Sequence, residues 1–306
     1  MAKLWQKENQ TTDAKIEKFT IGNDPVYDLQ LARYDVLGSL AHITMLEKVG
    51  LLAADELRPL CAELKAIYAQ IDAGNFTIEN GMEDVHSQIE FMLTEKIGDI
   101  GKRIHTGRSR NDQVALDIKL FLRAQITAIK EETLQLFNLL LSKSETHKNV
   151  LLPGYTHLQI AMPSSIGMWL GAYAESLVDD MEFLAAAYQV VNKNPLGSGA
   201  GYGSSFSINR NRTTELMGFK TLNYNSAYAQ MSRGKTEKLT AMALSSVAAT
   251  LSKLAMDCCL YMNQNFGFIR FKDREQADAC VTQLNGTELK GSKITLFVKE
   301  PKAIKP

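Results

Sequence analysis

Three stretches of the chain carry a helical pattern of apolar residues over about thirty residues or more: 112–148, 163–192 and 233–262. The average helix of a globular protein has roughly 12 residues, so these helices are unusually long. Long helices joined by loops bury their apolar faces against one another, and their outer seams can also pair with other subunits. The sequence therefore predicts a mainly α fold built on a long-helix bundle.

Shorter helices separated by glycines precede the bundle. Apolar residues recur at steps of three and four over 27–49 and 55–73, and a glycine follows each run. Asp55 is placed to cap the second of these helices, and a third begins near Asp84. No convincing strand is predicted before residue 265.

The period of the pattern changes near the C-terminus. FGFIRF (266–271) alternates apolar and polar residues, a short helix follows Asp273, and KITLFV (293–298) alternates again after an Asn-Gly turn. This pattern predicts a small β-α-β fragment. The expected domains are therefore an N-terminal helical domain over 1–111, a truncated central bundle over 112–265 and the β-α-β segment over 266–306.

Charge and cysteine usage narrow the classes of partner. The chain has 34 basic and 34 acidic residues, so no global field attracts nucleic acid, although the segment from Arg270 onward has a net charge of +3. Its four cysteines lack metal-site or disulfide spacing. The N-terminus has no apolar targeting segment, and no run approaches about 18 apolar residues. We therefore expect a cytoplasmic protein that does not associate with membranes.

Three polar loops lie at helix boundaries: 82–90, 103–113 and 152–163. Free backbone N–H groups and the helix dipole favour anions at such positions. The second loop contains GRSRND, in which Arg108 and Arg110 offer forked donors beside neutral polar side chains. A single loop of this kind is more often only a charged helix start, but the three together predict a site for a polyanionic substrate.

The histidines offer weaker signals. His157, between hydroxyl and amide neighbours in the third loop, could move a proton near neutral pH. Such a histidine is more often a structural one, and the same holds for His86 and His105. No two histidines have ligand spacing, no serine lies in a GxSxG motif, and GSGAGYG follows no strand. These absences argue against zinc, serine hydrolase and dinucleotide sites.

The motifs HTGRSRND (105–112), GYTHLQ (154–159) and PLGSGAGYG (195–203), in this order on long helices, closely resemble those of the argininosuccinate lyase family of the fumarase/aspartase superfamily. The resemblance runs from Lys3 to about Ile269. It implies a homotetramer whose active sites combine segments of three subunits. It also implies the reversible cleavage of argininosuccinate to arginine and fumarate in arginine biosynthesis, without a metal ion or organic cofactor.

The resemblance also assigns roles to residues. It implies that His157 is the catalytic histidine and that the neighbouring polar groups bind substrate. The implied substrate-binding residues are Ser109, Arg110, Asn111 and Thr156, with Asp84 and His86 helping to hold the guanidinium end. The chemistry needs this equipment, because removing a proton next to a carboxylate builds an aci-carboxylate dianion that positive and N–H donors stabilise.

The chain departs from the family pattern after NFGFI (265–269). In the family this stretch is followed by a mobile loop of the form GSSxMPxKxNP, which carries a catalytic serine, whereas here RFKDREQADACVTQLNG follows. Residues 264–300 instead resemble the second half of an RNA-recognition motif. That resemblance implies that Phe266, Phe268 and Arg270 lie on the sheet face where bases stack.

Three interpretations of the sequence remain open. The first is an argininosuccinate lyase-like enzyme whose turnover is impaired because the serine loop is missing. The second is an RNA-binding module formed by the C-terminal segment, although a two-stranded half-domain is marginal in water. The third is an inactive fusion or gene-model chimera that records ancestry only.

Overall fold

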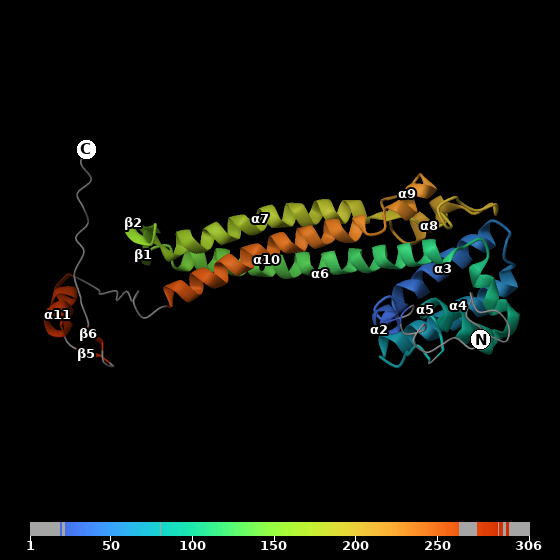
Figure 1. The fold of residues 1–306 in the computed structure, drawn as a ribbon, viewed down its shortest axis with the longest axis horizontal. Helices are drawn as coiled ribbons and strands as arrows, with labels where there is room; N and C mark the ends of the chain where they lie inside the picture. The colour runs from blue at the N-terminus through green and yellow to red at the C-terminus, as the bar shows by residue number, and fades with distance from the viewer. Residues whose placement is uncertain are drawn as a thin grey trace.

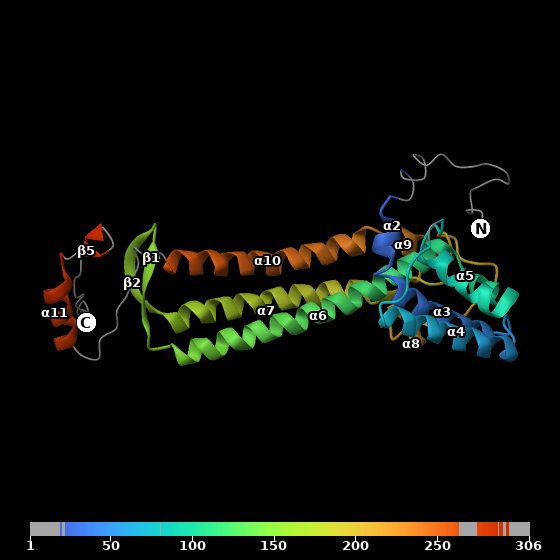
Figure 2. The same ribbon diagram turned by 90° about the horizontal axis from the view of Figure 1, so that it is seen from below.

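A computed structural model describes residues 19, 22–79, 81–262, 274–286, 288–289 and 292–293 of the chain. Its main feature is a bundle of three long helices: α6 (Arg110–Thr146), α7 (Ile166–Val191) and α10 (Lys235–Tyr261). The three run side by side along the long axis of the molecule (Figures 1 and 2). Each lies within a few residues of its predicted range, so the mainly α, long-helix fold is confirmed.

The bundle is held together by two apolar clusters and by polar contacts between its helices. One cluster surrounds Ile126, Leu184 and Val247, and the other surrounds Leu140 and Leu177. Buried in the seam between α7 and α10, the Asp180 carboxylate accepts hydrogen bonds from Ser246 Oγ at 2.5 Å and Thr250 Oγ1 at 2.7 Å. Because a buried carboxylate must be paired, these hydroxyls fix the register of the two helices.

Shorter helices pack around the start of α6 (Figure 1). They share one core, which includes Leu46, Leu60 and Ile89. α5 begins near Asp84 as predicted, and the Asp84 side chain caps it, whereas α4 begins after Ala53, whose N–H donates to Glu56. The prediction that Asp55 caps α4 is wrong, because it lies one position inside the helix. These elements are α2 (Asp24–Asp28), α3 (Ala32–Lys48), α4 (Ala54–Asp72), α5 (Val85–Ile97) and the 3-10 segment η1 (Gly98–His105).

Strands do occur before residue 265, so that prediction is wrong. β1 (Leu151–Thr156) and β2 (Gln159–Ser165) form an antiparallel hairpin at the far end of the bundle (Figure 2). A two-residue parallel pairing joins β3 to β4. Prolines at 153 and 163 and a glycine at 154 hid the hairpin, since these residues are depleted in strands. The remaining elements here are β3 (Lys193–Asn194), α8 (Arg210–Leu216), β4 (Thr221–Leu222) and α9 (Ser226–Met231).

The C-terminal fragment is described only in part. Its predicted helix is present as α11 (Arg274–Leu284), followed by a short hairpin of β5 (Glu288–Leu289) and β6 (Ser292–Lys293). The predicted strand over 266–271 and most of the one over 293–298 lie outside the described residues. The β-α-β arrangement and the three-domain division therefore stay predictions.

By length and composition alone α10 could cross a membrane, although no such segment was predicted from the sequence. Core helices of helical bundles pass the same test. Within the described part of the chain α10 packs along α7 and α6, yet only 22% of its most apolar window is buried. Exposed side chains include Met242, Leu251 and Met256. A single chain therefore leaves one face of α10 uncovered.

Gly167 allows α7 to approach the end of α6 closely. A Cβ atom at this position would lie 2.6 Å from both Lys148 Cα and Ser144 O. Gly167→Ala is expected to lower the free energy of unfolding by about 2 kcal/mol, because backbone overlap outweighs the better helix propensity of alanine. Urea unfolding followed by circular dichroism measures it. Gly171→Ala is the matched control, since its Cβ meets only the Ser144 hydroxyl at 3.3 Å; an equal loss there would contradict the reasoning.

Candidate functional site

The N-terminus of α6 holds the polar residues predicted to bind an anion. Ser109 is the N-cap in an extended conformation, and its Oγ accepts from Asn111 N at 3.3 Å. The next residue, Arg110, reaches back across the start of α5. Its Nη1 donates to Asp84 Oδ2 at 2.6 Å and its Nη2 to Ser87 Oγ at 2.8 Å. The fold therefore joins the first and second polar loops at one place.

The exposure of these groups suits ligand binding. Arg110 and Asp84 keep 25% and 18% of their side-chain surface open to solvent. The ion pair is therefore partly accessible, while each side chain is held in place by the other. Asn111 is exposed, and its Oδ1 accepts from Arg233 Nη1 at 3.3 Å. A half-open, oriented guanidinium beside neutral donors and a helix N-terminus can bind a carboxylate.

A cavity of 640 Å³ lies next to this helix start. One wall is the loop before α6, which ends in Arg108 and Ser109, and the other belongs to the glycine-rich loop over 195–206. Arg110 and Asn111 lie beside the cavity and do not line it. Lys102 and His105 add basic groups to the lining, and His105 Nε2 lies 2.9 Å from Glu90 Oε2. That hydrogen bond, together with the charge of His105, lowers the pKa of Glu90 against the opposing effect of burial. The cavity can hold a small polar anion.

Arg108 also lines the cavity, and its guanidinium is largely buried. The burial of its guanidinium lowers its pKa, and the nearby carboxylates of Asp35, Asp112 and Asp117 oppose this effect. Its Nη1 donates to Ser39 Oγ at 3.1 Å. The prediction that both arginines of GRSRND offer forked donors to a ligand stays a prediction.

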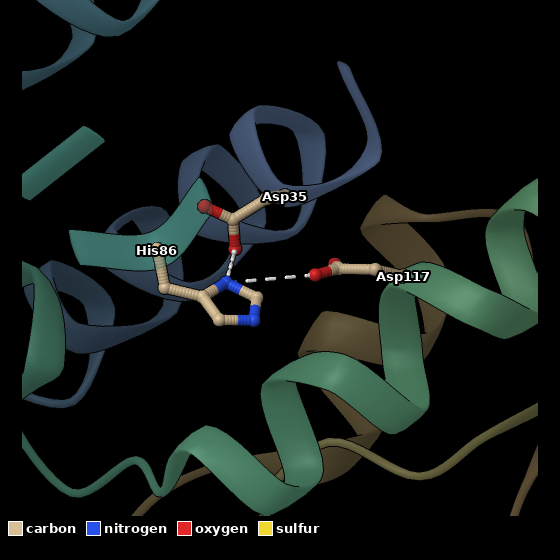
Figure 3. A group of neighbouring side chains, drawn as sticks. All are labelled: Asp35, His86 and Asp117. Carbon is tan, nitrogen blue, oxygen red and sulfur yellow. Dashed lines mark hydrogen bonds and ion pairs between the residues drawn. The ribbon is translucent and has the colours of Figure 1, made fainter. Parts of the chain in front are cut away.

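Beneath the helix start, three helices bring Asp35, His86 and Asp117 together in the interior (Figure 3). His86 Nδ1 lies 3.1 Å from Asp35 Oδ1 and 3.8 Å from Asp117 Oδ2. Their possible ligand atoms all lie within 4.8 Å of one another, which a small divalent cation could use. Arg108 supplies a positive charge close to the same carboxylates.

The two acids of this cluster have opposite pKa shifts. Burial alone would raise the pKa of Asp35, but the charge and hydrogen bond of His86, with Arg108, outweigh it and hold it at about 2. Burial, and then the negative charge of Asp35, raise the pKa of Asp117 well above its ordinary value. The side chain of His86 is only 1% exposed, which places it under the site rather than at its surface.

His42 makes the protein sensitive to acid. Its Nε2 donates to Thr106 O at 2.9 Å, since that carbonyl only accepts. Burial and then the Arg108 charge lower its pKa from 6.5 to about 3. The unfolded chain takes up a proton below pH 6.5 and the folded chain does not until about pH 3. The contribution of His42 is therefore complete above pH 6.5 and is lost progressively as the pH falls.

We expect the free energy of unfolding to fall by about 1.4 kcal/mol per pH unit between pH 6 and pH 4.5 because of this residue. Urea unfolding at a series of pH values measures the slope. His42→Gln keeps an N–H donor for Thr106 without a titrating ring, so its slope should be flatter by that amount. Identical slopes in the two proteins would show that His42 is not the group responsible.

The third polar loop lies far from the other two. It forms the β1–β2 hairpin, with Thr156 and His157 exposed at its tip, and His157 and Leu158 have left-handed φ values of 50° and 59°. The hairpin lies at the opposite end of the bundle from the start of α6 (Figure 2). At 1.5 Å per residue, the 37 residues of α6 span about 55 Å. One chain therefore does not bring His157 to Ser109, Arg110 or Asn111.

The residues predicted to stack RNA bases, Phe266, Phe268 and Arg270, lie outside the described residues. RNA binding therefore stays a prediction.

The buried acids Asp35 and Asp117 were missed, although a charged residue inside an apolar helical stripe is a signal that could have singled out both.

Comparison with known proteins relates this geometry to a family. The sequence profile of a family described as Lyase matches residues 6–278, which is most of the chain. The chain belongs to this lyase family. The match supports the lyase interpretation and extends into residues 264–278, which belong to the stretch that resembles part of an RNA-recognition motif.

Curated relatives within the family are argininosuccinate lyases. The one from Bacteroides thetaiotaomicron is 62% identical over 271 residues, which cover 89% of this chain and 60% of that protein. The one from Stenotrophomonas maltophilia is 38% identical over 266 residues, which cover 87% and 62%. The chain thus spans about three fifths of the length of these relatives.

Solved structures show the same fold. EDDS lyase in complex with formate superposes with a TM-score of 0.68 at 26% identity, covering 78% of this chain and 47% of that one. The fumarate lyase:delta crystallin from Brucella melitensis bound to cobalt gives a TM-score of 0.70 at 18% identity, covering 82% and 60%. The fumarase/aspartase-like architecture expected from the sequence is therefore confirmed.

Proposed function

We propose that the chain is an argininosuccinate lyase-like protein that binds argininosuccinate and cleaves it slowly to arginine and fumarate. The observation that carries the proposal is the oriented Arg110 guanidinium at the N-terminus of α6, beside Ser109 and Asn111. This arrangement suits a carboxylate, and relatives that share 62% of the aligned residues are named argininosuccinate lyases.

The remaining site residues receive roles in the same proposal. Arg110, Ser109 and Asn111 bind the carboxylates of the fumarate half, where the aci-carboxylate charge develops. Asp84 holds Arg110 in place and so acts through it. Thr156 contacts substrate and His157 assists proton transfer from the hairpin tip. His86 is buried and does not reach the substrate, so its role is to support the site from the protein interior.

The start of α6 with Arg110 and the hairpin tip with His157 are two half-sites at opposite ends of the bundle. Their separation supports a homo-oligomer. A second copy whose bundle runs antiparallel along this one would bring its hairpin toward the start of α6. The uncovered face of α10, with Met242, Leu251 and Met256 exposed, offers apolar surface for such packing. Each complete site would then combine Arg110 of one copy with His157 of another.

Slow turnover follows from the sequence after Ile269, where the serine-bearing loop of the family pattern does not follow. Removal of a group that acts in proton abstraction costs orders of magnitude in rate. A functional oligomer would retain substrate binding even where elimination is slow.

Fumarate release from argininosuccinate by the purified full chain tests the proposal, with succinate binding measured in parallel by calorimetry. We expect saturable binding and a slow release that both fall at least tenfold in Arg110→Gln, which keeps hydrogen-bonding capacity but loses the charge. Arg212→Gln, at an exposed position of α8 where the side chain pairs with Glu215 and not with the site residues, is the control. Binding that is absent from the folded chain, or that is equal in wild type and Arg110→Gln, would reject the proposal.

A further inference from the structure

Asp112 links the two walls of the cavity described above. It lies on the first turn of α6 and is fully buried. Its Oδ1 accepts from Ser109 N at 3.0 Å, which completes a capping box at the helix start. Its Oδ2 accepts from Gly197 N and Gly199 N, both at 2.9 Å. One carboxylate therefore receives hydrogen bonds from the loop before α6 and from the glycine-rich loop.

The glycine-rich loop depends on this anchor for its position. Gly197 has a φ of +85°, and Gly199 approaches Gly203 so closely that a Cβ would lie 2.6 Å from its carbonyl oxygen. From the other side, Gln230 Nε2 donates to Ser198 Oγ at 3.1 Å and to Gly199 O at 3.2 Å. The loop is thus held from two sides. The Asp112 carboxylate accepts from two of its backbone N–H groups, and the side-chain amide of Gln230 donates to its Gly199 carbonyl.

We propose that Asp112 is a positioning residue that sets the spacing between Ser109 and the glycine-rich loop, and thereby the affinity of the cavity for a dicarboxylate. This inference rests on the proposed function, because it takes the anion of the cavity to be the fumarate half of the substrate. Asp112 does not line the cavity, so it acts only through the backbone groups it holds. Asparagine at this position would replace one carboxylate oxygen by an NH2 group. That NH2 would then face a backbone N–H of Ser109, Gly197 or Gly199, and two donors cannot form a hydrogen bond.

The test compares the full-length wild type with Asp112→Asn. Succinate affinity is measured by calorimetry at 10 °C, and amide hydrogen exchange is measured at Ser109, Gly197 and Gly199. We expect Asp112→Asn to exchange faster at Gly197 and Gly199 and to bind succinate at least tenfold more weakly, while its circular dichroism stays that of the wild type. Glu56→Gln is the matched control, since Glu56 completes the capping box of α4 and its other partner is Arg103 of η1, not the glycine-rich loop.

The outcomes separate the two proposals. Faster exchange at the two glycines with unchanged succinate affinity would overturn the positioning role and leave Asp112 a purely structural cap. Unchanged exchange at all three amides would overturn it as well. Equal weakening in Glu56→Gln would attribute the effect to helix capping in general. A wild-type chain that binds no succinate would reject the proposed function, and with it any role of Asp112 in ligand affinity.

Discussion

Asp35→Asn is expected to lower the free energy of unfolding by about 3 kcal/mol or more, whereas Asp117→Asn leaves it unchanged or raises it. The two acids lie in one cluster and are equally buried (Figure 3). They differ in their partners. Asp35 is hydrogen-bonded to His86 and to Gln113. Loss of its negative charge would leave the nearby charges of His86 and Arg108 without their main counter-charge.

Asp117 has only weaker contacts, including a 3.8 Å approach of His86 Nδ1 to its Oδ2. Neither of its carboxylate oxygens accepts a hydrogen bond from the described residues, and burial and the charge of Asp35 raise its pKa. For an acid with a raised folded pKa, the unfolded chain releases its proton first as the pH rises above 3.8, so stability is lost above that pH. Asparagine removes this loss and nearly preserves shape.

Urea unfolding of both variants and wild type at pH 4 and pH 7 checks the pair of predictions. The advantage of Asp117→Asn over wild type should be greater at pH 7 than at pH 4, since only the ionisable side chain responds to pH. An equal, large loss of stability in both variants would contradict the distinction between the two acids. It would mean that the cluster needs both charges.

A mixture of two inactive variants is expected to recover lyase activity that neither has alone. His157→Ala removes the proposed proton-transfer group, and Arg110→Ala removes the carboxylate-binding group. Each variant alone should lose at least a hundredfold in the rate of fumarate release. If complete sites take these residues from different copies, randomly mixed oligomers should regain about a quarter of the wild-type rate, because that share of sites receives both native residues.

The measurement mixes the two variants in equal amounts, unfolds and refolds them together, and records the initial rate of fumarate release. A mixture of His157→Ala with His157→Gln serves as the control, because no pairing of these chains restores a native histidine. Mixed oligomers that form but recover no activity would contradict a site shared between copies.

The long helices were predictable because burial repeats over many turns and averages out local exceptions. α6, α7 and α10 each offer seven or more turns of signal at about 3.6 residues a turn. The start of α5 near Asp84 was also predicted, and its cap depends only on the next few residues. The sequence could not reveal the β1–β2 hairpin, whose two-residue turn uses His157 and Leu158 in a left-handed conformation usually taken by glycine or asparagine.

The site was predictable in its residue types but not in their placement. The GRSRND motif located Ser109, Arg110 and Asn111 at a helix start, and the structure placed them there. Which arginine faces solvent depends on packing against Ser39 and Asp84, residues far away along the chain. The distance from His157 to this helix start is equally non-local, because it follows from the uninterrupted length of α6.

Under the proposed function, the placement of Arg110 and His157 at opposite ends of the bundle would make the specific activity depend on the concentration of the chain. Dilution below the dissociation constant of the oligomer would leave each chain with an anion-binding end and a histidine-bearing end that never meet. The rate per chain would then fall with further dilution, and total rate would grow with more than the first power of chain concentration. An assay at a single concentration would describe the association equilibrium as much as the chemistry.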